Sequence, residues 1–209
     1  MKRVTMALLL CAATFCLAAP ARGADKVKQL IERAARAYEK GDNQQAVDLL
    51  QQAATEIQKK IGRTLEAFLP EPPRGWTADE VERESFSGTN LKDAGSITKV
   101  SRRYRRKDDE VEITITNMPQ LVKGVEQMLK QLNNPAVVKM MNQQPGTRVE
   151  IRRKHDWTIL AKQQDDDSEV TAVRGDTMIQ VRAPGQKLNV AAEFYDLVDT
   201  KALGKVPGK

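Results

Sequence analysis

The densest group of charged side chains in this 209-residue sequence is the run Arg, Arg, Tyr, Arg, Arg, Lys at 102–107. Cations around an aromatic ring are able to bind phosphate groups or anionic lipid headgroups. A second basic run, at 152–154, is a candidate for the same surface. The candidate anion or partner patch is therefore Arg102, Arg103, Arg105, Arg106, Arg152, Arg153 and Lys154.

The alternative for the first run is an ion-paired sheet face. Successive side chains of a strand point to opposite faces, so a strand would divide this positive charge. If residues 108–109 form a two-residue turn, Arg105 faces Glu112 across the hairpin. Lys107 then faces Glu110, and part of the charge is neutralised.

Other candidates for catalysis or metal binding have simpler structural explanations. The acidic stretch at 165–169 lacks the alternating ligands and central glycine of a calcium loop, and it suits an exposed turn. Met140 and Met141 suit core packing better than copper binding. His155 is the sole histidine, and no nucleophile elbow, phosphate loop or dinucleotide fingerprint occurs. We therefore expect a non-enzymatic protein without catalytic residues, metal or cofactor.

The first 23 residues have the layout of a secretory signal peptide. Lys2 and Arg3 precede an apolar stretch at 5–19, and small residues at 19–23 allow cleavage after Ala21 or Gly23. The stretch is shorter than the ~20 residues that span a bilayer, and no later segment approaches that length. The expected location is the periplasm or the exterior of the cell.

Cleavage changes the charge and the cysteine count. Removing 1–23 lowers Lys plus Arg from 34 to 31 against 28 Asp plus Glu, so the net charge falls from +6 to +3. Cys11 and Cys16 are lost, which leaves no cysteine for a disulfide, a thiolate metal site or a nucleophile. A small charge and an exported location argue against nucleic acid as a partner.

Residues 24–69 have the pattern of a helical hairpin. Apolar residues recur at helical spacing on both sides of Gly41, which suits the end of a first helix. The second helix carries a long apolar stripe that includes Leu50, Ile57, Ile61 and Leu65. Two helices cannot bury this stripe between them, so it covers either the rest of the chain or a partner protein.

The turn of this hairpin resembles a tetratricopeptide repeat. Residues 37–47 read Ala-Tyr-Glu-Lys-Gly-Asp-Asn-Gln-Gln-Ala-Val, with Leu50 and Ala53 after them. In that family small residues let antiparallel helices approach closely, and the units dock partner proteins. The chain departs from the family in having one unit and no closing proline near residue 58.

A proline-rich linker at 70–76 ends the helical pattern. Residues 77–209 then alternate like strands, with helices expected from Pro119, near 137–141 and at 189–203. Expected strands lie at 81–86, 97–106, 111–116, 147–153, 157–163, 169–174 and 177–183. This order predicts an α+β fold, an antiparallel sheet packed with helices, into which Trp76 docks.

The Pro-Arg-Gly-Trp entry at 73–76, the hairpin, the helical insertion and the closing helix together resemble the PsbP/Mog1 group of α/β/α sandwiches. That group implies exported accessory proteins and binding modules. The sequence thus predicts a binding or accessory module that contacts another exported or envelope protein. The alternative is a periplasmic carrier of a small apolar ligand or lipid.

The exported form is expected to begin at Arg22 or Ala24 and to be insensitive to reductant, because both cysteines leave with the signal peptide. Intact-mass analysis of protein recovered from its host, with and without dithiothreitol, measures this. A mass that retains Cys16 with acyl chains attached would contradict it.

Overall fold

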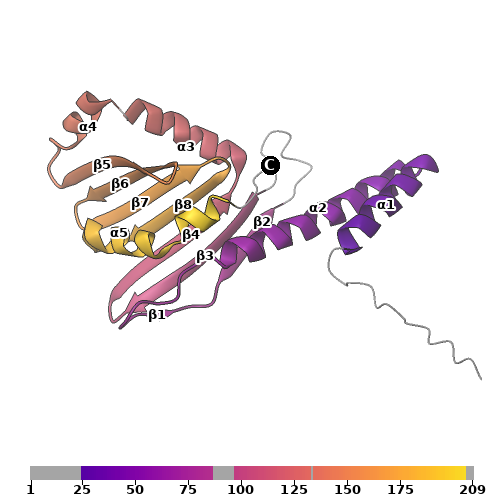
Figure 1. The fold of residues 1–209 in the computed structure, drawn as a ribbon, viewed down its shortest axis with the longest axis horizontal. Helices are drawn as coiled ribbons and strands as arrows, with labels where there is room; N and C mark the ends of the chain where they lie inside the picture. The colour runs from indigo at the N-terminus through magenta and orange to yellow at the C-terminus, as the bar shows by residue number, and fades with distance from the viewer. Residues whose placement is uncertain (1–24, 87–96, 133, 206–209) are drawn as a thin grey trace, which may run out of the picture.

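The computed structural model describes residues 25–86, 97–132 and 134–205 (Figure 1). The predicted signal peptide and the loop expected at 87–96 lie outside these residues. The helices are α1 (Asp25–Glu39), α2 (Asn43–Glu66), α3 (Pro119–Leu132), α4 (Pro135–Met141), α5 (Leu188–Leu197) and α6 (Thr200–Leu203). The strands are β1 (Thr77–Ala78), β2 (Glu82–Phe86), β3 (Ile97–Arg106), β4 (Asp109–Asn117), β5 (Thr147–Lys154), β6 (Trp157–Gln164), β7 (Asp167–Arg174) and β8 (Thr177–Ala183).

All eight strands form one antiparallel sheet, which confirms the predicted α+β class. The order across it is β1-β3-β4-β8-β7-β6-β5, and β2 also pairs with β3. The first hairpin, β3 with β4, therefore joins the last, β7 with β8, at the centre of the sheet. Strands β5 and β6 extend it to an edge formed by β5 (Figure 1).

Tight turns set the strand registers. Lys107 and Asp108 form the β3–β4 turn, with Lys107 at φ 55°, so Arg105 pairs with Glu110 and Arg106 with Asp109. The turn lies one residue earlier than the expected 108–109. The expected pairs, Arg105 with Glu112 and Lys107 with Glu110, are therefore wrong. Two-residue hairpin loops favour turns with a positive φ, and Lys107 adopts this left-handed conformation although lysine rarely does.

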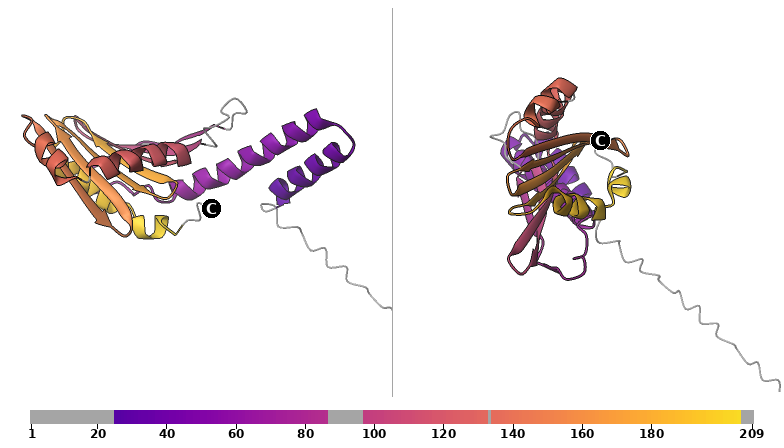
Figure 2. Two further views of the ribbon diagram at one scale, coloured as in Figure 1. Left: turned by 90° about the horizontal axis from the view of Figure 1, so that it is seen from above. Right: turned by 90° about the vertical axis from the view of Figure 1, so that its left-hand side faces the viewer.

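Helices cover both faces of the sheet (Figure 2). Ala172 and Ile179 belong to the large core under α5, whereas their sequence neighbours Val173 and Met178 pack with α3. This alternation is the period of two that a half-buried strand requires. The larger core, on the α5 face, also takes in Leu65 near the end of α2 and Leu203 of α6.

Helix α2 belongs to two packing units. Its first half packs on α1 through small residues, among them Ala46 and Ala53, in a cluster separate from the sheet. Near its end, Leu65 is 1% exposed and Leu69, just beyond the helix, is 7% exposed, and both lie in the core under α5. The last turns of the hairpin thus cover the chain's own sheet.

The linker between the hairpin and the sheet is fixed by an aromatic contact. The ring of Trp76 meets that of Phe194 edge-on at 4.8 Å between centroids, and the Arg106 guanidinium lies 4.6 Å from the Trp76 centroid. Trp76 is half-buried and packs against the core, which agrees with the predicted docking.

The single closing helix expected at 189–203 is instead two helices. Val198 is extended, with ψ 124°, and ends α5. Asp199 then caps α6 by accepting a hydrogen bond from the Ala202 amide at 2.9 Å. Aspartate is a strong helix N-cap, so an acid inside the apolar pattern marks a new start. Within the described residues, no helix is long and apolar enough to cross a membrane.

The double role of α2 predicts unequal effects of one substitution along it. Leu65→Ala removes a fully buried side chain and should lower the unfolding free energy by about 3 kcal/mol. Leu50→Ala is the matched control, because Leu50 is 51% exposed on the same helix and its loss should cost about 0.5 kcal/mol or less. Denaturant titration measures both, and equal losses would contradict the packing described here.

Candidate protein-docking surface

The seven basic residues of the sequence-derived patch lie in two separate places. Residues 102–106 belong to β3 and residues 152–154 to β5, with four strands between them. Five strand spacings of ~4.8 Å place the two groups roughly 24 Å apart. The structure therefore does not bring the two runs together into one patch.

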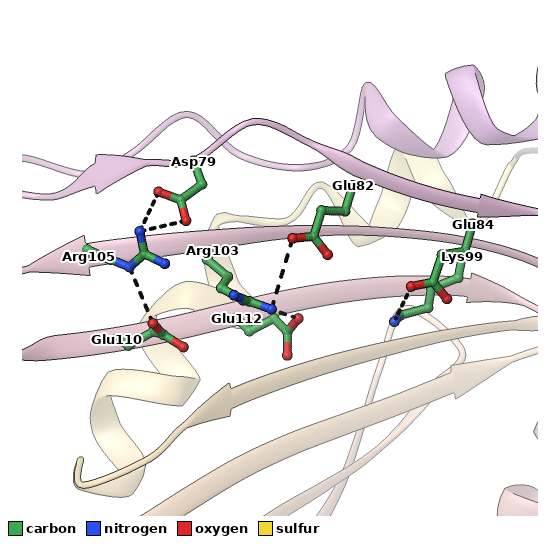
Figure 3. A network of polar contacts seen from close by, with 8 residues as sticks. All are labelled: Asp79, Glu82, Glu84, Lys99, Arg103, Arg105, Glu110 and Glu112. Atoms are coloured by element: carbon green, nitrogen blue, oxygen red, sulfur yellow. Dashed lines mark hydrogen bonds and ion pairs between the residues drawn. The ribbon is translucent and has the colours of Figure 1, made fainter.

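Two of the β3 arginines join an ion-pair network on the sheet face opposite α5 (Figure 3). Arg105 contacts Asp79 at 2.9 Å and Glu110 at 3.3 Å. Arg103 lies between Glu82 and Glu112, at 4.0 and 3.9 Å. Each guanidinium thus faces two carboxylates, which leaves little net charge for an anionic ligand. Exposed pairs of this kind contribute little to stability.

The other two arginines of β3 face the α5 side and hold the linker. Arg102 donates to the carbonyl oxygens of Asp79 at 3.1 Å and Pro70 at 3.3 Å. Tyr104 donates its hydroxyl hydrogen to the same Pro70 oxygen at 2.8 Å. Arg106 lies over Trp76 and pairs with Asp109 at 3.0 Å. These side chains fix the path of the chain between the hairpin and the sheet.

The basic residues of β5 are less compensated. Lys154 contacts Asp196 at 3.0 Å. Arg153 is exposed, and among the described residues it has no ion-pair partner. Arg152 is half-buried beside Tyr195, where burial raises the pKa of the Tyr195 hydroxyl to about 12. The uncompensated positive charge of the patch therefore lies at the β5 edge.

The most distinctive exposed feature is an apolar face on the hairpin of α1 and α2. Five of the nine large hydrophobic residues exposed in the described structure belong to it. They form the surface called here the hairpin face: Ile31, Tyr38, Val47, Leu50 and Ile57. Their exposed fractions run from 43% at Ile57 to 70% at Tyr38. So much apolar area on a small element is typical of a docking surface.

Helix geometry places these side chains on one side of the hairpin. Ile31 and Tyr38 directly follow Leu30 and Ala37, which are buried between the helices. Likewise Val47 and Leu50 directly follow Ala46 and Leu49, which are buried there too. One residue is a rotation of ~100° about a helix axis. Because α1 and α2 are antiparallel, this rotation turns the following residues toward the same face.

An open groove on this face joins the two helices. It is shallow, has a volume of about 510 Å³ and is lined in part by Val27, Ile31 and Ile57. Lys28, Glu32 and Lys60 complete its lining. Lys28 lies 3.9 Å from Glu32, whereas Lys60 has no ion-pair partner among the described residues. The groove is therefore apolar with an excess of positive charge at its rim.

The sequence predicts that the apolar stripe of α2 packs against either the rest of the chain or a partner protein. It does not predict that one part of the stripe is buried and another part exposed. Ile61 and Leu65 pack on the sheet core, while Leu50 and Ile57 stay exposed. Packing of the stripe against the chain's own sheet, one of the two expected alternatives, is therefore found only in the last turns of α2. Tyr38 and Val47 belong to the repeat-like segment 37–47, but that motif does not show whether they are covered, and only the packing of α1 on α2 shows that they remain exposed.

The remaining chemical candidates do not assemble into a site. Met140 is 60% exposed, so the core role expected for it is wrong. His155 lies in the β5–β6 turn at φ 51° and is exposed. A groove of about 530 Å³ on the sheet is lined mainly by charged residues, including Glu112, Glu169 and Arg182. No group of three or more metal-binding side chains is present in the described part of the chain.

Comparisons with protein-family models, with curated proteins and with solved structures found no match for this chain. The resemblances to tetratricopeptide repeats and to the PsbP/Mog1 group stay predictions. The geometry of the chain's own residues is therefore the basis for its function.

Burial raises the pKa of Tyr104 to about 12, which predicts a loss of stability in alkali. The folded protein favours the neutral phenol, so this stabilisation is complete below pH 10 and is lost as the pH rises from 10 to about 12. Tyr104→Phe should lower stability at pH 8 by about 1 kcal/mol, through the lost bond to Pro70, and should flatten the alkaline decline.

Tyr38→Phe is the matched control for this measurement, because Tyr38 is 70% exposed. It should leave the unfolding free energy and its alkaline decline unchanged in denaturant titrations from pH 8 to 11.5. A decline that is equally steep in Tyr104→Phe would show that the Tyr104 hydroxyl is not the group responsible.

Proposed function

We propose that this chain is a non-enzymatic, exported binding module that contacts another exported or envelope protein through the hairpin face. The observation that carries the proposal is the uncovered apolar face of α1 and α2. The rest of the chain supports that face, since Leu65 and Leu69 anchor the hairpin in the sheet core.

The occupant that fits the hairpin face best is an amphipathic helix of the partner protein. Two antiparallel helices offer a groove in which a third helix lays its apolar residues at i, i+3, i+4 and i+7. The 15 residues of α1 extend about 22 Å, which matches a partner helix of about four turns.

The positive charge beside the groove indicates which kind of partner helix would bind there. Lys60 lacks an ion pair among the described residues, and Lys28 faces Glu32 at the longer distance of 3.9 Å. A partner helix with carboxylates beside its apolar stripe would therefore gain charge complementarity. The expected ligand is an acidic amphipathic helix, and the small apolar ligand or lipid stays the alternative.

Site-specific photo-crosslinking in the host envelope tests this function. A benzoylphenylalanine at Leu50 should give a specific adduct with a second protein, and the linked peptide should belong to an amphipathic helix. Ile57→Glu should reduce the adduct by about ten-fold or more, because it places a charge in the apolar groove. Gln52→Glu is the matched control, since Gln52 lies on the opposite, polar side of α2.

Three outcomes would contradict the proposal. An adduct with twice the mass of the chain assigns the hairpin face to a second copy. A retained lipid in the native mass spectrum of wild-type protein that is lost in Ile57→Glu assigns it to a carrier function. Adducts that are insensitive to Ile57→Glu show that the face has no specific occupant.

A further inference from the structure

A second interaction surface lies at the free edge of the sheet, on β5. In an antiparallel pair every second residue directs its backbone N–H and C=O away from the neighbouring strand. Lys154 pairs with Trp157 across the two-residue turn, so even-numbered residues of β5 bond to β6. Thr147, Val149, Ile151 and Arg153 therefore direct their backbone groups outward.

The first half of this outer edge is already occupied. The Val149 amide donates to Oδ1 of Asn142 at 2.6 Å, and Nδ2 of Asn142 donates to the Val149 carbonyl oxygen at 3.1 Å. The Thr147 amide donates to the Gln144 carbonyl oxygen at 3.2 Å. The side chain of Asn142 thus makes the paired hydrogen bonds that a residue of an added strand would make.

The second half of the edge is open. Within the described residues, the outward backbone groups of Ile151 and Arg153 have no hydrogen-bond partner. Ile151 is half-buried and Arg153 is exposed. Two residues of the edge therefore offer four unpaired groups in the geometry of a further strand, which is the requirement for β-strand addition.

The charge of this segment selects the occupant. Arg153 points to the α3 face, and Arg152 and Lys154 point to the α5 face. Pairing with the same edge of a second copy would bring two Arg-Arg-Lys runs together, and like charges opposite each other are unfavourable. An acidic strand would instead place carboxylates opposite these cations on both faces of the sheet.

We infer that the open end of β5, from Ile151 to Lys154, binds an extended acidic segment of another protein by adding it to the sheet as a further strand. Backbone hydrogen bonds to Ile151 and Arg153 supply the register, and the guanidinium groups of Arg152 and Arg153 supply the preference for acids. Asn142 limits the added strand to this end of β5. This surface is separate from the hairpin face and does not depend on it.

A labelled peptide tests the inference with the mature full-length chain. The probe is the fluorescein-labelled peptide Thr-Val-Glu-Asp-Glu-Val-Thr, followed by fluorescence anisotropy at low salt. Ile151→Pro should weaken binding by about ten-fold, because proline removes the outward N–H at an edge position that tolerates it. Asn142→Ala should tighten binding about three-fold by freeing Val149, and the exposed neighbour Gln143→Ala should have no effect.

A second measurement keeps the test decisive if Ile151→Pro does not fold. Wild-type protein is titrated with two peptides that are N-methylated at alternate residues, one set at odd and the other at even positions. One set should abolish binding and the other should leave it intact, because a strand bonds to its neighbour through every second residue. Arg153→Glu should weaken binding of the unmodified peptide at least as much as Ile151→Pro does.

Three results would overturn the inference. The first is the absence of saturable binding up to roughly 1 mM peptide. The second is binding that responds to Arg153→Glu but is equal for both methylated peptides, which indicates charge attraction without strand addition. The third is a concentration-dependent dimer of Asn142→Ala, which assigns the edge to a second copy of the chain.

Discussion

The arrangement of this protein depends on the apolar stripe of α2, which is longer than any one element can cover. The helix has 24 residues and extends about 36 Å. The sheet core takes Leu65 at one end, and α1 takes Ala46 and Leu49 at the other. A helix pair buries only the strip between its members, so Leu50 and Ile57 remain exposed beside that strip. The same stripe therefore anchors the hairpin and supplies part of the exposed face through which we propose that a partner binds.

The basic side chains of the sheet fall into two groups, which differ in whether they have partners within the chain. On β3, the arginines contact carboxylates of β4 and of Asp79, which follows β1, or they hold the linker, so their charges are used within the fold. On β5, which is an edge, Arg153 has no such neighbour among the described residues. A central strand has partners on both sides and an edge strand on one, so strand order decides which basic run stays available. Both candidate interaction surfaces, the hairpin face and the β5 edge, lie where no other element of the described chain packs against them.

Local patterns in the sequence predict the elements well, because each depends on nearby residues. Alternation over 97–106 and 157–163, and the helical spacing on both sides of Gly41, correspond to β3, β6 and the hairpin. Strand order depends on contacts between distant segments, and local pattern carries no information about it. Sequence reasoning therefore joined Arg102 and Arg153 in one patch, although four strands separate them. The turn at Lys107 and the break at Val198 were missed because single-residue dihedral angles decide them.

The central claim is that the two halves of α2 differ in cover, and native-state hydrogen exchange along this helix tests it most directly. Amides near Ile61 and Leu65 should exchange only through global unfolding, because their side chains lie against or within the sheet core. Amides near Leu50 and Ile57 should exchange through local opening at a lower free energy, and this free energy should not change with protein concentration. Equal protection along the whole helix, or protection near Leu50 that rises with concentration, would contradict the account.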